Sequence, residues 1–574
     1  MKRRLVLLFL LAAAPAAAQT DEVVRAALYL TGADAPEALD NRLVDELESF
    51  RSRPLPINLA SRARLLESGL LTPYQVAALA EYRGVSGDVL SFAELERVDG
   101  FGKEAVVALR PFLSLESARR PGEAVKDTLV FRHSALVRAT LKDVGAKYRL
   151  TAGNLEAAGA WKGRNGTFYG LYRLPKGKIL VGDYNVRYGQ GLAFWSAFQL
   201  AGLSTLEAFS KRANGITPSW SFNGTGTHRG VAWDHTGRHF QWALFGALDG
   251  TVGAHAGWLG RHGQAGVTVT PARVSLDGKL GIRGVDLFGE AAWSGKTPAG
   301  LAGSLFPLGE HWKGALQFRA IPSAYSGKKN GEYGAAAGVS YLADNRAFKA
   351  SLTVDTSLLP KPGVDTGRRQ VKSTGLLSWT VTDNWLVESR LVYRHRNYDS
   401  NRADVRADAT WNRGVWTVKG RLNGVHDGGF GLLGYLEGGW KPPDWTAWLR
   451  LTAFSTSGWQ SRIYTYERDA PGNFSAPAYY GTGFSAVAFA GWKKRFRKTT
   501  FKLYLRGSYR WQKEKPGQAG LKLQVQADRE RLPTFSRCPS RIRSLLRPFQ
   551  DLMFLTVVWC CAAIFPRLSP RRTL

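Results

Sequence analysis

The chain has 574 residues, a formal net charge of +32 and an unusual mixture of 63 Gly with 28 Phe, 20 Tyr and 19 Trp. Its 3 Cys, Cys538, Cys560 and Cys561, all stand near the C-terminal end, which excludes a disulfide framework or a thiolate metal site in the body of the chain. No apolar run is long enough for a transmembrane helix. If such a chain crosses a bilayer, it must do so as a closed barrel, because lipid cannot satisfy an open sheet edge.

The first 18 residues have the pattern of a secretory signal peptide. Lys2, Arg3 and Arg4 precede an apolar run from Leu5 to Leu11, and small residues lead to Ala18. A basic start, a short apolar segment and a small-residue exit predict cleavage after Ala18. We therefore expect a protein that leaves the cytoplasm.

Charge divides the rest of the chain into three parts. Residues 20–116 carry 16 acidic and 10 basic side chains, a net charge of −6, whereas residues 117–530 carry +28 and residues 531–574 carry +7. Few glycines interrupt the first part, which favours helices. The sequence thus predicts a small acidic all-α domain over residues 20–116, ahead of a large basic body over 117–530.

Three helix starts are predicted in the acidic domain. Thr72 and Ser91 are each followed three residues later by Gln or Glu, the pattern of a capping box. Asn58 is a third expected N-cap. Gly100 and Gly102 lie between two short helical segments, where glycine permits a tight hairpin.

Residues 55–115 resemble the duplicated helix-hairpin-helix domain of the ComEA competence type. The resemblance depends on Ile57–Ala60, Ala77, Tyr82-Arg83, Gly87, Ser91-Phe92, Glu94-Leu95, Val98 and Gly100–Gly102. In that family the hairpin amides hold a DNA phosphate, which implies Gly100, Phe101, Gly102 and Lys103 as nucleic-acid-binding residues. The acidic balance of the domain favours the alternative, a structural or protein-contact module, because phosphate binding needs a basic footprint.

Residues 117–530 alternate between apolar and polar side chains. In 385–396, Trp385 and Leu391 stand on one face, opposite Arg390 and Arg394. The same period of two recurs in 403–411, 415–423 and 501–511. Alternating segments of about ten residues, with aromatic ends and charged second faces, are typical of a membrane barrel with a wet lumen. The sequence predicts a large antiparallel outer-membrane β-barrel of roughly 18–22 strands.

Connections of two lengths are expected in the barrel. Asp344-Asn345, Asp383-Asn384 and Asn412-Arg413 are predicted to be tight turns. Longer polar connections are expected at 396–402, 424–431 and 466–477. Short turns at one end and long loops at the other are typical of outer-membrane barrels.

Two further stretches carry a second resemblance. Gly182–Leu192, and Arg462–Glu467 with Pro477–Gly481, are similar to secreted helix-hairpin-helix proteins that have a large β-barrel behind the hairpin domain. The alternative interpretation is barrel packing, in which glycines let a loop fold inward and aromatic side chains fill the space.

The C-terminal part departs from the barrel pattern. Leu521–Asp528 alternates as a closing strand should, but the aromatic residue expected near 529–531 is absent. We interpret residues 531–574 as an anomalous Arg- and Cys-rich tail, the product of a frameshift or a disordered segment. Residues 532–574 are predicted not to pair with the barrel.

The sequence carries no recognisable enzyme motif. His235 and His239 are four apart on an expected strand, about 13 Å, which is too far to share a metal. We therefore predict no enzyme, no cofactor and no metal site. The expected function is that of an outer-membrane channel, transporter or assembly component, with the helical domain in the periplasm. The basic barrel predicts that its solute is an anion. The alternative is DNA binding or DNA uptake by the hairpin. The expected partners are outer-membrane lipid and either DNA or a periplasmic protein.

Overall fold

The computed structural model describes residues 19–39, 41–52, 54–117, 130–196, 202–222, 224–260, 262–327, 331–359 and 367–531. The predicted signal peptide, residues 1–18, lies outside the described residues, and so does the tail over 532–574. Among the residues that are described, no helix has the length and apolarity to cross a bilayer.

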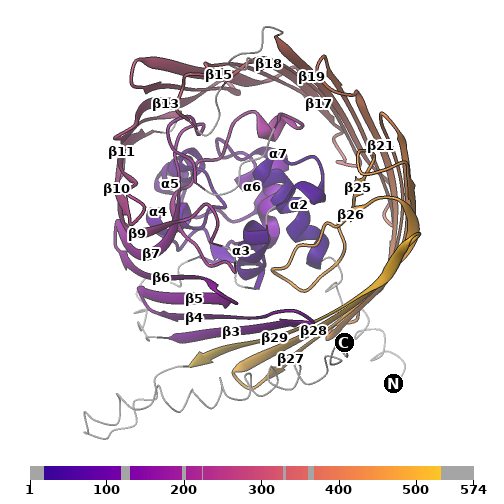
Figure 1. Cartoon of the computed structure of the whole chain (residues 1–574). Coiled ribbons are helices and arrows are strands. Elements are labelled where there is room, and N and C mark those ends of the chain that lie inside the picture. Colours follow the sequence, from indigo (N-terminus) through magenta and orange to yellow (C-terminus); the bar gives the residue numbers. More distant parts are fainter. Residues whose placement is uncertain are drawn as a thin grey trace, which may run out of the picture.

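The body of the chain is a closed antiparallel barrel of 24 strands, with the short strand β8 as an additional pairing on β7 (Figure 1). This confirms the predicted fold class. The strands are β3 (Phe131–Thr140), β4 (Val144–Ala152), β5 (Leu155–Lys162), β6 (Asn165–Leu174), β7 (Gly177–Arg187), β8 (Gly215–Pro218), β9 (His228–Thr236), β10 (Phe240–Ala247), β11 (Val252–Leu259), β12 (Gly263–Thr270), β13 (Arg273–Ile282), β14 (Val285–Ser294), β15 (Thr297–Pro307), β16 (Trp312–Ile321), β17 (Glu332–Leu342), β18 (Phe348–Leu359), β19 (Arg368–Thr382), β20 (Trp385–Arg396), β21 (Arg402–Arg413), β22 (Trp416–Asp427), β23 (Phe430–Trp440), β24 (Trp445–Thr456), β27 (Thr482–Phe496), β28 (Thr499–Gln512) and β29 (Lys515–Arg531).

The predicted faces of the strands are confirmed. Leu391, Val405 and Leu422 are exposed on the outside of the barrel, whereas Arg406 and Arg421 form ion pairs in its lumen. Because successive side chains of a strand point to opposite faces, one apolar and one charged residue per step satisfies both lipid and lumen.

Three expectations about the barrel were wrong. The strand number of roughly 18–22 was too low, since short strands such as β11 and β12 are rich in Gly and Ala, whose small side chains give little contrast between the two faces. Residues 424–431 form no long loop, because β22 continues to Asp427 and Gly428, with φ of +65°, makes a tight turn. Similarly, Asn412-Arg413 end β21, and the turn follows at Gly414.

The barrel closes by pairing its last strand with its first. Arg531 lies opposite Phe131, and the register of β29 on β3 runs back to Lys522 opposite Thr140. β29 is 17 residues long. The sequence predicted a shorter closing strand over Leu521–Asp528, and this was wrong. Arg531 completes the pairing without the expected aromatic residue.

Tryptophan side chains line the outside of the barrel near its short-turn end. Trp416 lies opposite Trp440, and Trp445 lies opposite Trp492, with ring centroids 6.4 Å and 6.3 Å apart. Aromatic rings at this level anchor a barrel at the membrane–water interface, as the sequence predicted.

The α-helices of the described residues belong to the N-terminal part, and the short 3-10 helix η4 (Leu206–Ala208) lies in the connection between β7 and β8. The helices of the N-terminal part are α2 (Gln19–Thr31), η2 (Pro36–Ala38), α3 (Asn41–Ser52), α4 (Arg62–Glu67), α5 (Pro73–Ser86), α6 (Phe92–Leu95), α7 (Gly102–Leu109) and η3 (Arg110–Phe112), together with the parallel pair β1 (Leu55–Pro56) and β2 (Leu113–Ser114). Thr72 makes the predicted capping box with Gln75, and Ser91 caps α6. Asn58 is not an N-cap: its side chain bonds the backbone N–H and C=O of Val89, both at 3.0 Å.

Candidate functional site

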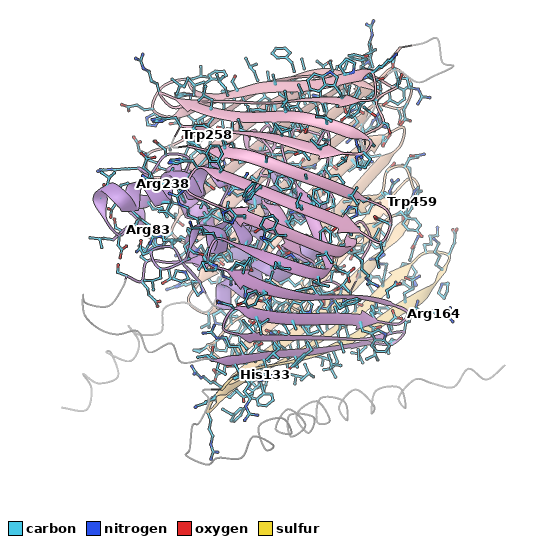
Figure 2. All side chains as sticks on the ribbon, turned by 90° about the vertical axis from the view of Figure 1, so that its left-hand side faces the viewer. Arg83, His133, Arg164, Arg238, Trp258 and Trp459 are labelled. Atoms are coloured by element: carbon cyan, nitrogen blue, oxygen red, sulfur yellow. The ribbon has the colours of Figure 1, made fainter. Side chains whose placement is uncertain are left out.

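Most of the helical segment lies inside the barrel, and the part around Arg83 projects beyond one end (Figure 2). Figure 1 shows α2 to α7 within the ring of strands, and we call residues 19–117 the plug. One apolar cluster, which includes Leu47, Leu65, Leu79 and Phe112, holds the helices together. The sequence placed this domain in the periplasm; the structure shows its side chains in contact with the inner wall of the barrel, and its side of the membrane stays a prediction. The position of the plug agrees with its charge, because an acidic segment lies against a basic wall.

Two carboxylates near η2 contact three arginines of the wall. Asp34 accepts from Arg390 of β20, with Nη2–Oδ2 at 2.9 Å. Glu37 accepts from Arg421 of β22 at 2.7 Å and lies 3.4 Å from Arg406 of β21. Pro36 begins the single turn of η2 and so fixes the backbone between the two acids. We call these five side chains the η2 cluster.

The plug carboxylates in this cluster remain charged far into acid. Burial raises the pKa of Glu37, but Arg421, Arg406 and the backbone amide of Tyr466 together lower it to about 2. Burial likewise opposes the ionisation of Asp34, and Arg390 and Lys372 bring its pKa below the usual value. At neutral pH both carboxylates are therefore anions.

Three more carboxylates of the plug pair with bases of the barrel. Glu67 receives three hydrogen bonds from Arg173, at 2.7 Å, 3.0 Å and 3.2 Å. Glu104 lies 2.9 Å from Lys349 and 3.2 Å from Lys313, and Glu96 lies 2.6 Å from Arg346. In all five of these cases the acid belongs to the plug and the base to the barrel. The opposite net charges of the two parts therefore meet at one interface.

The hairpin singled out by sequence lies at the start of α7, beside these contacts. The carbonyl of Gly100 accepts from Gln75 Nε2 at 2.7 Å, and the ring of Phe101 is buried. Gly100 and Gly102 have φ of +81° and +68°, the conformation that favours glycine. Lys103 is exposed, and the next residue, Glu104, is bound to the wall. DNA binding by this hairpin stays a prediction.

The first motif of the second resemblance forms a loop that folds into the lumen. Glu290 of β14 accepts three backbone hydrogen bonds from it: from Gln190 at 2.6 Å, Leu192 at 3.0 Å and Ala193 at 3.0 Å. Gly189 and Gly191 have positive φ, which brings these amides together. Further along the same connection, Thr205 donates to the carbonyl of Gly32 in the plug at 2.9 Å.

The second motif is another inward loop, residues 457–481, which includes β25 (Ile463–Tyr464) and β26 (Ala478–Tyr479). Glu467 accepts hydrogen bonds from Tyr479 and Arg506, and Asp469 accepts one from Lys522. Tyr466 stacks on Phe474 with ring centroids 4.5 Å apart, and both pack on the apolar cluster of the plug. The amide of Tyr466 also donates to Glu37 at 3.0 Å.

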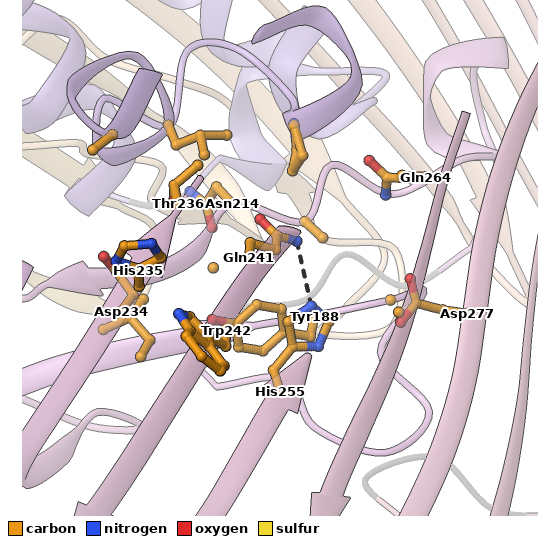
Figure 3. Close-up of a pocket in the computed structure, with 18 of the residues that line it drawn as sticks. Tyr188, Asn214, Asp234, His235, Thr236, Gln241, Trp242, His255, Gln264 and Asp277 are labelled. Atoms are coloured by element: carbon orange, nitrogen blue, oxygen red, sulfur yellow. Dashed lines mark hydrogen bonds between the residues drawn. The ribbon is translucent and has the colours of Figure 1, made fainter. Parts of the chain in front are cut away.

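A small cavity of about 40 Å³ lies between the plug and strands β9 to β13 (Figure 3). Tyr188 stacks on His255 with centroids 3.8 Å apart, and Gln241 lies within 3.3 Å of the His255 ring nitrogen. The stacked rings of Tyr188 and His255 lie between Asp234 and Asp277 in this view (Figure 3). Within the described parts of the chain, no group of His, Cys, Asp and Glu has the arrangement of a metal site.

A larger cavity, of about 420 Å³, adjoins the η2 cluster. Eight basic and four acidic side chains line it: Arg25, Lys349, Arg390, Arg406, Lys419, Arg421, Arg450 and Arg468, with Asp34, Glu207, Glu388 and Glu437. Sequence reasoning placed Arg390, Arg406 and Arg421 on the inner face but missed Asp34, Glu37 and Glu290. The available signal was the opposite charge of segments 20–116 and 117–530.

No protein-family model matches the chain. No curated protein matches it either. Among solved structures, the P pilus usher (PapC) translocation pore is 10% identical with a TM-score of 0.36, over 70% of this chain and 99% of that one. The copper transporter OprC is 9% identical with a TM-score of 0.38, over 72% and 82% of the two chains. OccK5 (OpdH) of Pseudomonas aeruginosa is 9% identical with a TM-score of 0.29, over 70% and 97%. All three TM-scores are below 0.5.

Proposed function

We propose that the protein is an outer-membrane transport channel for anionic solutes, and that its N-terminal helical domain is the gate. The observation that carries the proposal is the row of five plug carboxylates, Asp34, Glu37, Glu67, Glu96 and Glu104, each paired with a Lys or Arg of the barrel. A basic lumen attracts anions, and the plug neutralises part of that lumen while it is seated.

The orientation of the barrel supports entry of the plug from the periplasm. Figure 2 places Arg83 of the plug and Arg238 of a tight turn at one end, and Trp459 and Arg164 at the other. The end with Arg238 has the short turns, the side that faces the periplasm in outer-membrane barrels. The long inward loops enter from the opposite, outer end. Transport then requires the plug to shift or leave, because its helices occupy the lumen.

Conductance of the full-length protein in planar bilayers tests the proposal. The wild-type protein should stay mostly closed, and the double variant Asp34→Asn/Glu37→Gln should show frequent large openings with an anion-selective reversal potential. Asp88→Asn, which removes a plug carboxylate near the end of α5, is the matched control and should behave as wild type. Openings that favour cations contradict the anionic solute. A double variant that folds, as judged by heat-modifiable gel mobility, and still stays closed contradicts the gate.

DNA binding by the ComEA-like hairpin is the second candidate. It is favoured by the exposed side chain of Lys103 and by the open space around Gly102, where an added Cβ meets no atom within 4 Å. A mobility shift with the full-length protein should then weaken with salt and in Lys103→Gln. The absence of a shift at low salt would leave the gate as the sole role of the plug.

A further inference from the structure

We propose that Arg390, Arg406 and Arg421 form the solute-binding site of the lumen, and that Asp34 and Glu37 occupy it as internal competitors of the solute. The ligand would be a small solute with two carboxylate groups, whose binding displaces the η2 segment. This inference rests on the proposed function and names the solute class and the trigger of that gate.

The three wall arginines lie close enough together that their positive charges repel, and neighbouring anions stabilise this arrangement. Arg390 and Arg406 lie directly opposite each other on β20 and β21, and like charges in this position repel. Arg421 follows on the next strand, where its guanidinium lies 5.2 Å from the ring of Tyr435. Three guanidinium groups on adjacent strands therefore form one cationic surface.

Carboxylates of the wall neutralise only part of this surface. Arg390 lies 3.2 Å from Asp404, and Asp408 lies 2.9 Å from Arg406 and 2.6 Å from Arg421. A guanidinium has five N–H donors, so one carboxylate leaves donors over. The remaining donors point to Asp34 and Glu37, which stand three residues apart on one segment of the plug.

The adjoining cavity gives a solute access to the same arginines. Its volume of about 420 Å³ suits a small molecule, and Arg390, Arg406 and Arg421 line it together with Asp34. Guanidinium groups bind carboxylates through paired, charge-assisted hydrogen bonds. Two carboxylates of one solute would replace the two that the plug supplies, and the plug would lose its contact with this part of the wall.

Calorimetric titration of the full-length protein in detergent tests the site directly. Glutarate, which carries two carboxylates, should bind, whereas the neutral diamide glutaramide should not, and the monocarboxylate butyrate should bind more weakly. The double variant Asp34→Asn/Glu37→Gln should bind glutarate on the order of tenfold more tightly, because it lacks the internal competitor. Asp88→Asn should bind as wild type.

Variants of the wall provide the converse test. Arg421→Gln should lose glutarate binding, and Arg421→Lys, which keeps the charge but not the paired donors, should retain a weakened affinity. If either variant fails to fold, the double plug variant still decides. The proposal is overturned if glutarate and glutaramide bind alike, or if the double variant opens in bilayers yet binds glutarate no more tightly than wild type. In the latter result the gate survives and the competitor does not, whereas a double variant that stays closed contradicts the gate itself.

Discussion

Glu290 accepts a hydrogen bond of 2.6 Å from the backbone amide of Gln190, a residue of the loop that folds into the lumen. Two further amides donate to the same carboxylate. Glu290→Gln should loosen this loop, because a Gln side chain has one acceptor oxygen and turns an N–H group toward the amides. Each charge-assisted bond is worth about 1.5–3 kcal/mol, so a loss of about 2 kcal/mol or more is expected. Limited proteolysis of the loop and thermal unfolding measure this loss of stability. Glu388→Gln, at a wall carboxylate 3.7 Å from Lys419, is the control and should change the protease sensitivity and the unfolding temperature little.

Glu37→Gln should weaken the seating of the plug most among single plug variants. Breaking a buried ion pair leaves its partners unpaired and costs about 3–5 kcal/mol. Exposed pairs contribute about 0–1 kcal/mol, so Glu96→Gln, whose partner Arg346 is partly exposed, should have a much smaller effect. Protease sensitivity of the plug in the folded barrel is the measurement. Equal sensitivity of the two variants would contradict the ranking.

Plug seating should be insensitive to pH from neutral to about 4.5. The folded-state pKa values of Glu37 and Glu104 are about 2, below the ordinary value of 4.5. A lowered pKa stabilises the folded state above the ordinary value, and that contribution disappears as the pH falls from about 4.5 through 2. Bilayer openings should therefore increase only in that acidic range. Openings that increase between pH 7 and 5 would show that other groups control the gate.

Gly32→Ala should prevent normal seating of the plug. Gly32 has φ of +70°, and a Cβ there would lie 2.5 Å from the backbone nitrogen of Ala208. Neither the strain nor the contact with backbone can be relieved by a side-chain rotation. Gly84→Ala, at an open position in helix α5, is the control and should be neutral or stabilising by up to about 1 kcal/mol. Thermal unfolding and plug proteolysis of both variants give the comparison.

The barrel should close without residues 532–574. The pairing of β29 on β3 runs from Lys522 to Arg531, so a chain ended after Arg531 retains the whole closing strand. A chain ended after Gly520 lacks that pairing and leaves an open edge in the membrane. Heat-modifiable gel mobility should therefore be kept in the first and lost in the second. If the first also fails to assemble, residues beyond 531 contribute to closure.

The sequence predicted the barrel well because its signal is local. Arg390, Arg406 and Arg421 alternate with Leu391, Val405 and Leu422, and that period alone assigns each to its face. The caps at Thr72 and Ser91 are local in the same sense. The site was not predictable in this way, since Glu37 and Arg421 are 384 positions apart.

Asn58 illustrates the same limit on a smaller scale. Its residue type and position suit an N-cap, but a long-range contact with Val89 takes up its side chain. The acidic plug and the basic barrel were both visible in the composition. The negative charge of residues 20–116 argued against DNA binding, and the positive charge of residues 117–530 argued for an anionic solute. The two were not connected, because no local pattern shows that one segment lies inside the other.

The contact between Tyr466 and Glu37 connects an inward loop of the barrel with the plug. Trp459 of the same loop lies at the end of the barrel opposite the short turns, whereas Arg83 of the plug lies at the short-turn end (Figure 2). Thermodynamic linkage makes such a coupling reciprocal. A ligand that reorganises the loop around Tyr466 must therefore change the affinity of the wall for the plug, and withdrawal of the plug must change that loop. In the proposed channel, occupancy at one mouth of the barrel would thereby alter the plug at the other mouth before any solute has crossed.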